Sequence, residues 1–156
     1  MKIMISGHRN FKLSGYDKEW IQEQIEEAIV FYPGRAVCSK DKYIGLCGAA
    51  DGVDLWYLEL LHSHLLDYHI YIPFEEQDLY MTKKDAERRK YFIGEARITK
   101  KARNREMVED CNEAIVVWDG TKGGTFNCFQ QLIEAKKNIY WINPLTKVIN
   151  YIKNKP

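Results

Sequence analysis

Residues 114–125 constrain the fold more than any other stretch, because they place a buried strand directly before a glycine-rich turn and a helix. The strand reads Ala-Ile-Val-Val-Trp, an apolar and β-branched run typical of a strand covered on both faces. The turn contains Gly120, Gly123 and Gly124, and apolar residues recur at helical spacing from Phe126 onward. This layout brings backbone N–H groups and a helix N-terminus around an anion. An ordinary strand-to-helix turn is the alternative interpretation.

The glycines of this turn let a ligand approach the backbone closely, since they carry no Cβ atom. Thr121 and Thr125 add hydroxyl groups, and Lys122 adds a positive charge. Asp119 stands at the end of the strand. The composition of the turn therefore predicts an anion-binding loop.

A second ligand loop is predicted at the N-terminus. Residues 2–5 read as a short apolar strand that runs into Ser6, Gly7, His8 and Arg9. His8 is a candidate general acid or base, and equally a candidate structural hydrogen-bonding residue. Arg9 suits a phosphate or a carboxylate, because its guanidinium presents a rigid fork of donors.

A third glycine-bearing loop follows the next expected strand, at residues 42–46. The helix before that strand spans residues 17–31 and ends at Pro33-Gly34, and the helix after it spans residues 51–66. The loop between contains Gly48, Ala49, Asp51 and Asp54. Asp51 is a plausible N-cap and Asp54 lies in the first helical turn, where a carboxylate favours the helix dipole. Contact with ribose hydroxyls is the functional alternative for both acids.

The remaining chain alternates in the same way. Residues 69–72 form a third strand, residues 139–142 a last strand and residues 144–153 a terminal helix. Residues 80–105 carry ten Lys or Arg, which predicts a solvated helical face or, alternatively, an anion-attracting surface. Arg103 and Asn104 open another helix just before the central strand.

Length and charge exclude several classes of protein. A chain of 156 residues with 46% hydrophobic residues suits one domain, residues 1–156, with a sizeable core. A net charge of +1 gives no global attraction for nucleic acid or membrane. No apolar run approaches the length of a membrane span, and the four scattered cysteines indicate free thiols, so we expect a cytoplasmic protein. No metal or cofactor is predicted, and His62 and His64 read as helix-surface residues.

Alternating strands and helices predict an α/β fold, a three-layer Rossmann-like sandwich with a parallel sheet of about five strands. Ligands bind such sheets at the carboxyl ends of the strands, where the strand order reverses. With the order 3-2-1-4-5, the first and fourth strands are neighbours at that point. The three glycine loops then converge on one crevice.

Four motifs in order carry a resemblance to a known family. They are Ile5-Ser6-Gly7-His8-Arg9, Gly48-Ala49-Ala50-Asp51-Gly52-Val53-Asp54, Arg103-Asn104-Arg105-Glu106-Met107, and Trp118-Asp119-Gly120 with Gly123-Gly124-Thr125. From about residue 3 to 142 the chain resembles the SLOG superfamily, and within it the YspA/YpsA-like branch, many of whose members occur in bacteria and phages. The resemblance implies a Rossmann-like fold that binds nucleotides or nucleotide-derived ligands, often as a homodimer, and it assigns Arg9 and Arg103 to anionic groups.

The chain departs from the enzymes of that superfamily at one position. Its nucleotide phosphoribohydrolases carry a P-G-G-x-G-T-x-x-E element, and Gly123-Gly124-Thr125 matches the glycine-threonine core. Cys128 occupies the position of the catalytic glutamate, and no carboxylate follows until Glu134. Asp119, Asp51, Glu75 and the imidazole of His8 are the weak catalytic candidates that remain.

Three functions are compatible with these motifs. The first is binding of a nucleotide-derived ligand, such as a signalling nucleotide, without hydrolysis. The second is an N-glycosidic hydrolase or transferase acting on nucleoside monophosphates, which needs a carboxylate beside the anomeric carbon. The third is an accessory role in nucleic-acid processing, although nucleic acid is an unlikely partner for a chain of this charge.

A homodimer or higher even-numbered assembly is also expected. The helix at residues 51–66 has a wide apolar face that includes Trp56, Tyr57, Leu60 and Leu61. The segment at residues 80–98 adds Tyr80, Tyr91, Phe92 and Ile93. Surplus aromatic faces are typical of interfaces. The alternative is that these two segments cover one another within one subunit.

Overall fold

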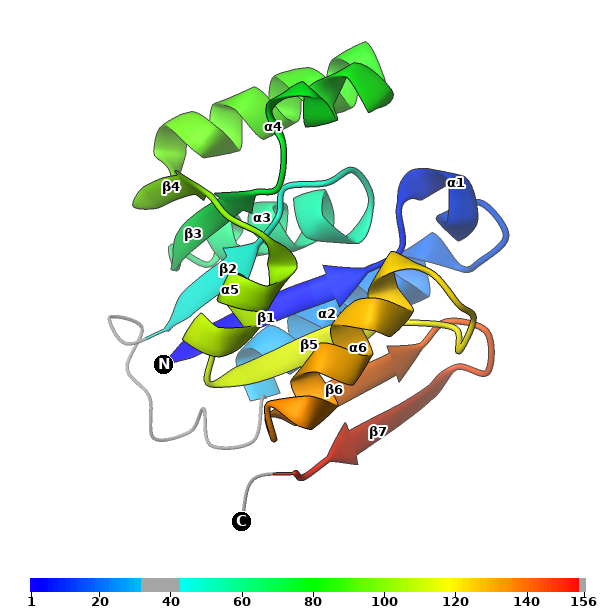
Figure 1. The fold of residues 1–156 in the computed structure, drawn as a ribbon. Helices are drawn as coiled ribbons and strands as arrows, with labels where there is room; N and C mark the ends of the chain where they lie inside the picture. Colours follow the sequence, from blue (N-terminus) through cyan, green and yellow to red (C-terminus); the bar gives the residue numbers. More distant parts are fainter. Residues whose placement is uncertain (32–42, 155–156) are drawn as a thin grey trace.

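The computed structural model describes residues 1–31 and 43–154, apart from the side chains of Phe31 and Glu75. The helix stop expected at Pro33-Gly34, the first residue of the strand expected at residues 42–46, and Cys38 lie outside the described residues. The elements (Figure 1) run in the order β1 (Lys2–Gly7), α1 (Asn10–Leu13), α2 (Lys18–Phe31), β2 (Ile44–Cys47), α3 (Val53–Ser63), β3 (Asp67–Ile72), the 3₁₀ helix η3 (Glu75–Tyr80), α4 (Lys83–Glu95), β4 (Ile98–Lys101), α5 (Asn104–Asp110), β5 (Glu113–Val117), α6 (Gly124–Glu134), β6 (Asn138–Asn143) and β7 (Val148–Ile152).

The described strands form one sheet of seven in the order β4-β3-β2-β1-β5-β6-β7. All neighbours pair in parallel except β6 and β7, which pair antiparallel. The five strands expected from the sequence occupy the middle of this sheet in the predicted order. The Rossmann-like α/β fold is therefore confirmed, with one further strand at each edge.

Strand residues alternate between two hydrophobic clusters, as a sheet covered on both faces requires. Along β1, Ile3 and Ile5 belong to the cluster beneath α2 and α3, whereas Met4 belongs to the cluster beneath α5 and α6. Figure 1 shows α5 and α6 on the near face of the sheet and α2 and α3 on the far face. These helices and the sheet make up the three layers.

The prediction of a terminal helix at residues 144–153 is wrong, because this segment turns back and forms β7. Asn143 starts the turn by accepting hydrogen bonds from the N–H groups of Leu145 and Thr146 through its side chain. Lys147 then adopts a positive φ of 55°. The following residues Val148–Ile152 are mostly β-branched or aromatic, which favours a strand paired with β6 over a helix.

The basic segment contains both a helix and a strand. Thr82 caps α4 by accepting a hydrogen bond from the N–H of Asp85 at 3.2 Å, as N-cap threonines do. Residues Ile98–Lys101 then add β4 to the sheet beside β3, and each of the four is exposed. The solvated helical face is confirmed for Lys83, Lys84 and Lys90 of α4, which are exposed, whereas Arg89 is buried and β4 was not expected.

The apolar face of α3 is covered within the subunit. Trp56, Tyr57 and Leu61 are buried, and Phe92 of α4 joins the same cluster. The two segments therefore cover one another, which is the alternative that the sequence left open. Tyr91 on α4 stays 52% exposed. Homo-oligomerisation accordingly stays a prediction that rests on the family resemblance.

Candidate functional site

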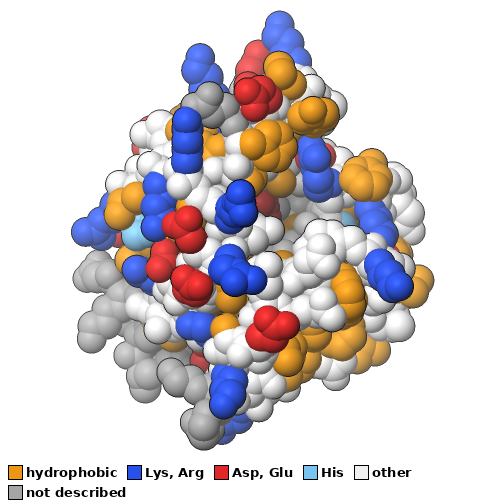
Figure 2. All heavy atoms as spheres, viewed as in Figure 1, with side chains coloured by type: hydrophobic (Ala, Val, Ile, Leu, Met, Phe, Trp, Pro, Cys, Tyr) orange, Lys and Arg blue, Asp and Glu red, His pale blue; other side chains and the backbone are white. Residues whose placement is uncertain are grey.

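A cleft of about 580 Å³ opens at the carboxyl ends of β1, β2, β3 and β5. The three glycine loops converge on it, joined by the start of α5 and by the segment that links β3 to η3. Figure 2 shows this side of the molecule, with lysine and arginine side chains around the hollow. The cleft lies where the strand order reverses, which is the usual ligand site of such sheets.

Two glycines let the loops after β1 and β2 pack in direct contact. A Cβ atom at Gly7 would lie 2.6 Å from the side chain of Val53. Gly52 has a φ of +84°, and a Cβ atom there would lie 2.7 Å from the carbonyl oxygen of His8. Neither position accepts a side chain without a shift of the neighbouring loop. These contacts fix the loops after β1 and β2 relative to each other at the wall of the cleft.

Asp119 lies beneath the loop after β5 and organises it. Its carboxylate accepts hydrogen bonds from the Thr121 N–H at 3.1 Å, the Thr121 hydroxyl at 2.6 Å and the Tyr16 hydroxyl at 2.6 Å. Burial favours the neutral acid, but these bonds outweigh it and lower the pKa of Asp119 below its ordinary value. The bond to Asp119 also raises the pKa of Tyr16 to about 12. Asp119 is 7% exposed and does not line the cleft.

His8 connects the same loop to β1. Its Nε2 accepts a hydrogen bond from the backbone N–H of Asp119 at 3.1 Å, so this nitrogen carries no proton and the ring is neutral. The 3.2 Å separation between Nε2 and the Asp119 carboxylate is then not an ion pair. Burial lowers the pKa of His8, and the nearby charge of Lys12 lowers it further, against the opposing charge of Asp119. The geometry favours the structural role for His8.

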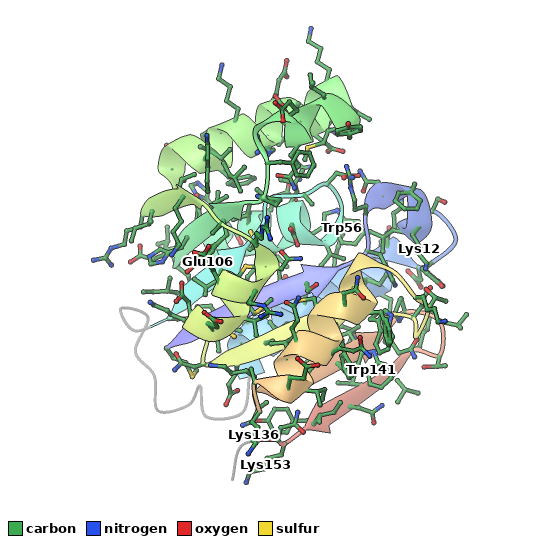
Figure 3. The ribbon with its side chains drawn as sticks, in the orientation of Figure 1. Lys12, Trp56, Glu106, Lys136, Trp141 and Lys153 are labelled. Carbon is green, nitrogen blue, oxygen red and sulfur yellow. The ribbon has the colours of Figure 1, made fainter. Side chains whose placement is uncertain are left out.

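One end of the cleft is suited to an anion. Gly123 precedes α6 with no side-chain hydrogen bond to the helix N-terminus, and Gly123, Gly124 and Thr125 all line the cleft. A Cβ atom at Gly124 would meet no protein atom within 4 Å. Lys12 reaches this end from α1 and contacts the Thr121 hydroxyl (Figure 3). Lys122 also lines the cleft, so a helix N-terminus and two cationic side chains face the same space.

Arg9 and Asp51 form an ion pair in which Arg9 lines the cleft and Asp51 lies outside the lining. The Nε of Arg9 donates to Asp51 at 2.5 Å, and the backbone N–H of Asn10 donates to the other carboxylate oxygen at 3.2 Å. The N-cap of α3 is Gly52, so the interpretation of Asp51 as the N-cap is wrong. Asp51 instead anchors the start of α1. Arg9 lines the cleft, and its Nη2 also donates to the Tyr80 carbonyl oxygen at 3.4 Å.

Asp54 is the only carboxylate among the described residues that line the cleft. It lies in the first turn of α3, as expected, and accepts a hydrogen bond from the Ala50 N–H at 3.1 Å. Burial raises the pKa of Asp54 to about 7, although hydrogen bonds from the Ala50 and Gly48 N–H groups oppose the shift. Near neutral pH this side chain therefore exists in both its acidic and its basic form.

Cys128 does not replace the missing glutamate. It is 1% exposed on α6 and lies below the cleft floor rather than in its lining. Burial raises the pKa of this thiol to about 11, against the effect of a hydrogen bond with Ser6. A buried protonated thiol is a poor nucleophile and a poor base. Cys128 is therefore part of the core.

The other end of the cleft was not predicted. Phe74 follows β3, is 43% exposed and stands edge-to-face with Tyr80 at a ring separation of 6.2 Å. Pro73 and Gln77 belong to the same segment after β3 and also line the cleft, as do Met107 of α5 and Phe11 of α1. No glycine or charge pattern marks these residues in the sequence, and only the aromatic residue directly after Pro73 pointed to them.

Most of the residues predicted to bind ligand line the cleft. Those that do are Ser6, Gly7, His8, Arg9, Gly48, Asp54, Asn104, Thr121, Gly123, Gly124 and Thr125. Those outside the lining are Ala49, Asp51, Arg103, Asp119 and Gly120. Of the catalytic candidates whose side chains the structure describes, only His8 lines the cleft, and its Nε2 is already bonded. The side chain of Glu75 lies outside the described part of the chain. Asp54, assigned from the sequence to ligand binding alone, is the carboxylate with access to it.

Neither a metal site nor a membrane span is found among the described residues. No group of three or more His, Cys, Asp or Glu side chains in the described ranges is placed to hold a metal ion. No helix in the same ranges is long and apolar enough to cross a membrane. Of the cysteines, Cys47, Cys111 and Cys128 are free and buried.

Comparison with known proteins supports the fold. No family model matches the chain, and no curated protein matches it in sequence. The structural genomics protein TM1055 superposes with a TM-score of 0.53, covering 88% of this chain and 71% of its own at 12% identity. DNA processing protein A (DprA) from Streptococcus pneumoniae gives 0.61 over 90% of this chain at 15% identity.

The present chain spans about half of DprA, since the match covers 49% of that protein. At these identities the likeness establishes the fold alone.

Proposed function

We propose that this chain binds a nucleotide or a nucleotide-derived ligand in the cleft, with a phosphate group at the N-terminus of α6. The observation that carries the proposal is the convergence of Gly123, Gly124, Lys12 and Lys122 on one end of the cleft. Backbone N–H groups and ammonium groups both stabilise a phosphate. The glycines leave the space that its oxygens need.

The middle of the cleft suits a sugar. Asp54 and Asn104 both line it, and carboxylate and amide groups are the usual partners of ribose hydroxyls. The aromatic ring of Phe74 at the opposite end offers a face for a base. Phosphate, sugar and base thus each have a matching part of the cleft.

The test is direct identification of ligand. Purified protein is denatured, and released small molecules are analysed by mass spectrometry, while calorimetry measures the affinity of nucleoside monophosphates and of the matching nucleosides. We expect the monophosphates to bind at least about tenfold more tightly, since the phosphate adds charge-assisted hydrogen bonds. Equal affinity for nucleoside and nucleotide, or no binding of either, would contradict the proposal.

A second candidate function is cleavage of the N-glycosidic bond, which the position of Asp54 favours. In this reaction the bond from the anomeric carbon to the base breaks, water adds its oxygen to that carbon, and a proton goes to the departing base. A carboxylate beside the sugar stabilises the oxocarbenium-like transition state. A pKa of about 7 also suits a group that exchanges a proton near neutral pH.

The two functions separate in an assay for free base. Each nucleoside monophosphate is incubated with wild-type protein and with Asp54→Asn, and free base is quantified by chromatography. If the chain is a hydrolase, base accumulates with wild type and not with Asp54→Asn, while the variant still binds the nucleotide. Binding without release of base by wild type supports a pure binding protein.

A further inference from the structure

Gln77 holds an unusual position at the end of the cleft opposite the phosphate site. Its side chain lines the cleft although the residue is only 5% exposed. Its Oε1 accepts a hydrogen bond from Nη2 of Arg89 at 3.3 Å. No described residue accepts a hydrogen bond from its Nε2. This nitrogen is not among the fully buried, unpartnered polar atoms of the described residues, so it is open to a ligand in the cleft.

Arg89 fixes the direction of this amide. It lies on α4, is 7% exposed, and forms no ion pair with any described carboxylate, while its Nε has no hydrogen-bond partner among the described residues. A guanidinium carries donors and no acceptor. If the Gln77 amide turned over, its NH₂ group would face those donors and both groups would lose their bond. Arg89 therefore keeps Oε1 toward itself and leaves Nε2 for the cleft.

The distance along the sheet matches a nucleotide lying across it. The phosphate end belongs to the loop after β5 and Gln77 to the segment after β3, and β1 and β2 lie between them (Figure 1). Three steps of about 4.8 Å between neighbouring strands give roughly 14 Å. A ligand with its phosphate at α6 therefore extends its base toward β3, beside the exposed ring of Phe74.

We infer that Gln77, held by Arg89, reads the edge of the base by donating its Nε2 hydrogen to a keto oxygen. This inference rests on the proposed nucleotide binding and adds to it the class of base. Hypoxanthine, guanine and uracil carry a keto oxygen where adenine and cytosine carry an amino group. An amino group brings a donor against a donor, so a buried site of this kind rejects it.

The experiment compares matched nucleotides by calorimetry. Inosine monophosphate and adenosine monophosphate differ at the group in question, as do uridine monophosphate and cytidine monophosphate. With wild-type protein we expect the keto member of each pair to bind about tenfold more tightly or better, the effect of one satisfied against one unsatisfied hydrogen bond.

Two variants test the cause. Gln77→Glu replaces the donor by an acceptor and still pairs with Arg89, so the preference should reverse toward the amino bases. Arg89→Met releases the amide to turn, so both members of each pair should bind within about threefold. Gln130→Glu makes the same change on the exposed side of α6 and should keep the wild-type ratio. Thermal melting shows whether each variant is folded, and Gln77→Glu carries the test alone if Arg89→Met is not.

The outcomes distinguish this inference from the function on which it rests. Wild-type protein that binds nucleotides with equal affinity for keto and amino bases overturns the role of Gln77 and leaves nucleotide binding intact. A ratio unchanged by Gln77→Glu overturns it as well. Wild-type protein that binds none of the four nucleotides overturns both proposals.

Discussion

The backbone N–H of Asp119 donates a hydrogen bond to Nε2 of His8 at 3.1 Å, which ties the loop after β5 to the end of β1. These two loops form adjacent walls of the cleft. The bond occupies the ring nitrogen and keeps His8 neutral, while the carboxylate of the same aspartate holds Thr121 and Tyr16. His8 and Asp119 thus hold two walls of the cleft together, and of the two only His8 also lines it.

Asp119→Asn is expected to destabilise the fold in a pH-dependent way. The folded-state pKa of Asp119 is depressed, so the carboxylate contributes stability above its ordinary pKa near 4 and loses it as pH falls toward the folded value. At pH 7 the variant should be less stable by about 1.5–3 kcal/mol, the range for hydrogen bonds to a charged group. Urea denaturation at pH 7 and pH 3 checks this, and a gap that stays constant between them would contradict it.

Gly124→Val should weaken nucleotide binding strongly and leave stability nearly unchanged. A Cβ atom there meets no protein atom within 4 Å, and Gly124 lines the end of the cleft assigned to the phosphate. Gly94→Val on α4 is the matched control, since a Cβ atom there also meets nothing within 4 Å and the residue lies outside the cleft lining. Calorimetry should show lost affinity for Gly124→Val alone. Equal affinity in both folded variants would remove this loop from the site.

Binding should fall as salt rises, and Lys122→Ala should weaken it by about tenfold, the lower limit for loss of one charge-assisted hydrogen bond. Arg103→Ala is the control, because it removes one positive charge from an exposed residue that does not line the cleft. The family resemblance assigns Arg103 to an anionic group, so this pair of variants also tests that assignment. A larger loss for Arg103→Ala than for Lys122→Ala would favour the resemblance over the geometry.

Asp54→Asn should become more stable relative to wild type as pH rises from 4 to 8. The folded-state pKa of Asp54 is raised from 3.8 to about 7, so ionising this buried carboxyl costs stability across that window. The nearby charge of Asp51 adds to the cost and that of Arg9 reduces it. The relative gain is on the order of a few kcal/mol at most. Thermal melting of both proteins at pH 4 and pH 8 measures it, and parallel curves would show that Asp54 is not buried in this way.

The homo-oligomer expected from the family resemblance is tested by light scattering at micromolar concentration. A mass near 18.4 kDa would refute it. Because Trp56 and Phe92 are buried within one subunit, the interface must use other residues. Tyr80 and Leu79 of η3 are 70% and 76% exposed and are the first positions to substitute by serine if the assembly exists.

The central sheet was predictable because its strands are buried on both faces and read as apolar runs. The two edge strands were not, for a physical reason. Residues Ile98–Lys101 are all exposed, so no burial pattern marks β4, and only pairing with β3 makes it a strand. In β7 the β-branched residues do favour a strand, and the prediction of a helix at residues 144–153 did not take them into account. Edge strands depend on a partner that local sequence does not reveal.

The glycine loops of the site were also predictable, because a backbone that approaches a neighbour closely needs glycine, and glycine is visible in the sequence. The direction in which a side chain points leaves no such mark in the sequence. Asp51 and Asp119 follow strands just as Asp54 follows β2, yet Asp51 turns to bind Arg9 and Asn10 of the neighbouring loop, and Asp119 turns to bind Thr121 of its own loop. Of the three, only Asp54 lines the cleft. Gln77 reaches the cleft from a 3₁₀ helix with no motif of its own. Which carboxylate or amide faces a ligand is decided by packing between distant segments.

The indole of Trp118 gives the molecule an optical reporter of its own cleft. This ring stacks on Trp141 with a centroid separation of 5.3 Å, and its Nε1 donates to the carbonyl oxygen of Thr121 at 2.7 Å. Thr121 lines the cleft, so the chromophore is bonded to the loop assigned to the phosphate. Tryptophan emission responds to hydrogen bonding and to neighbouring rings, which makes occupancy of the cleft readable by fluorescence in the unlabelled protein.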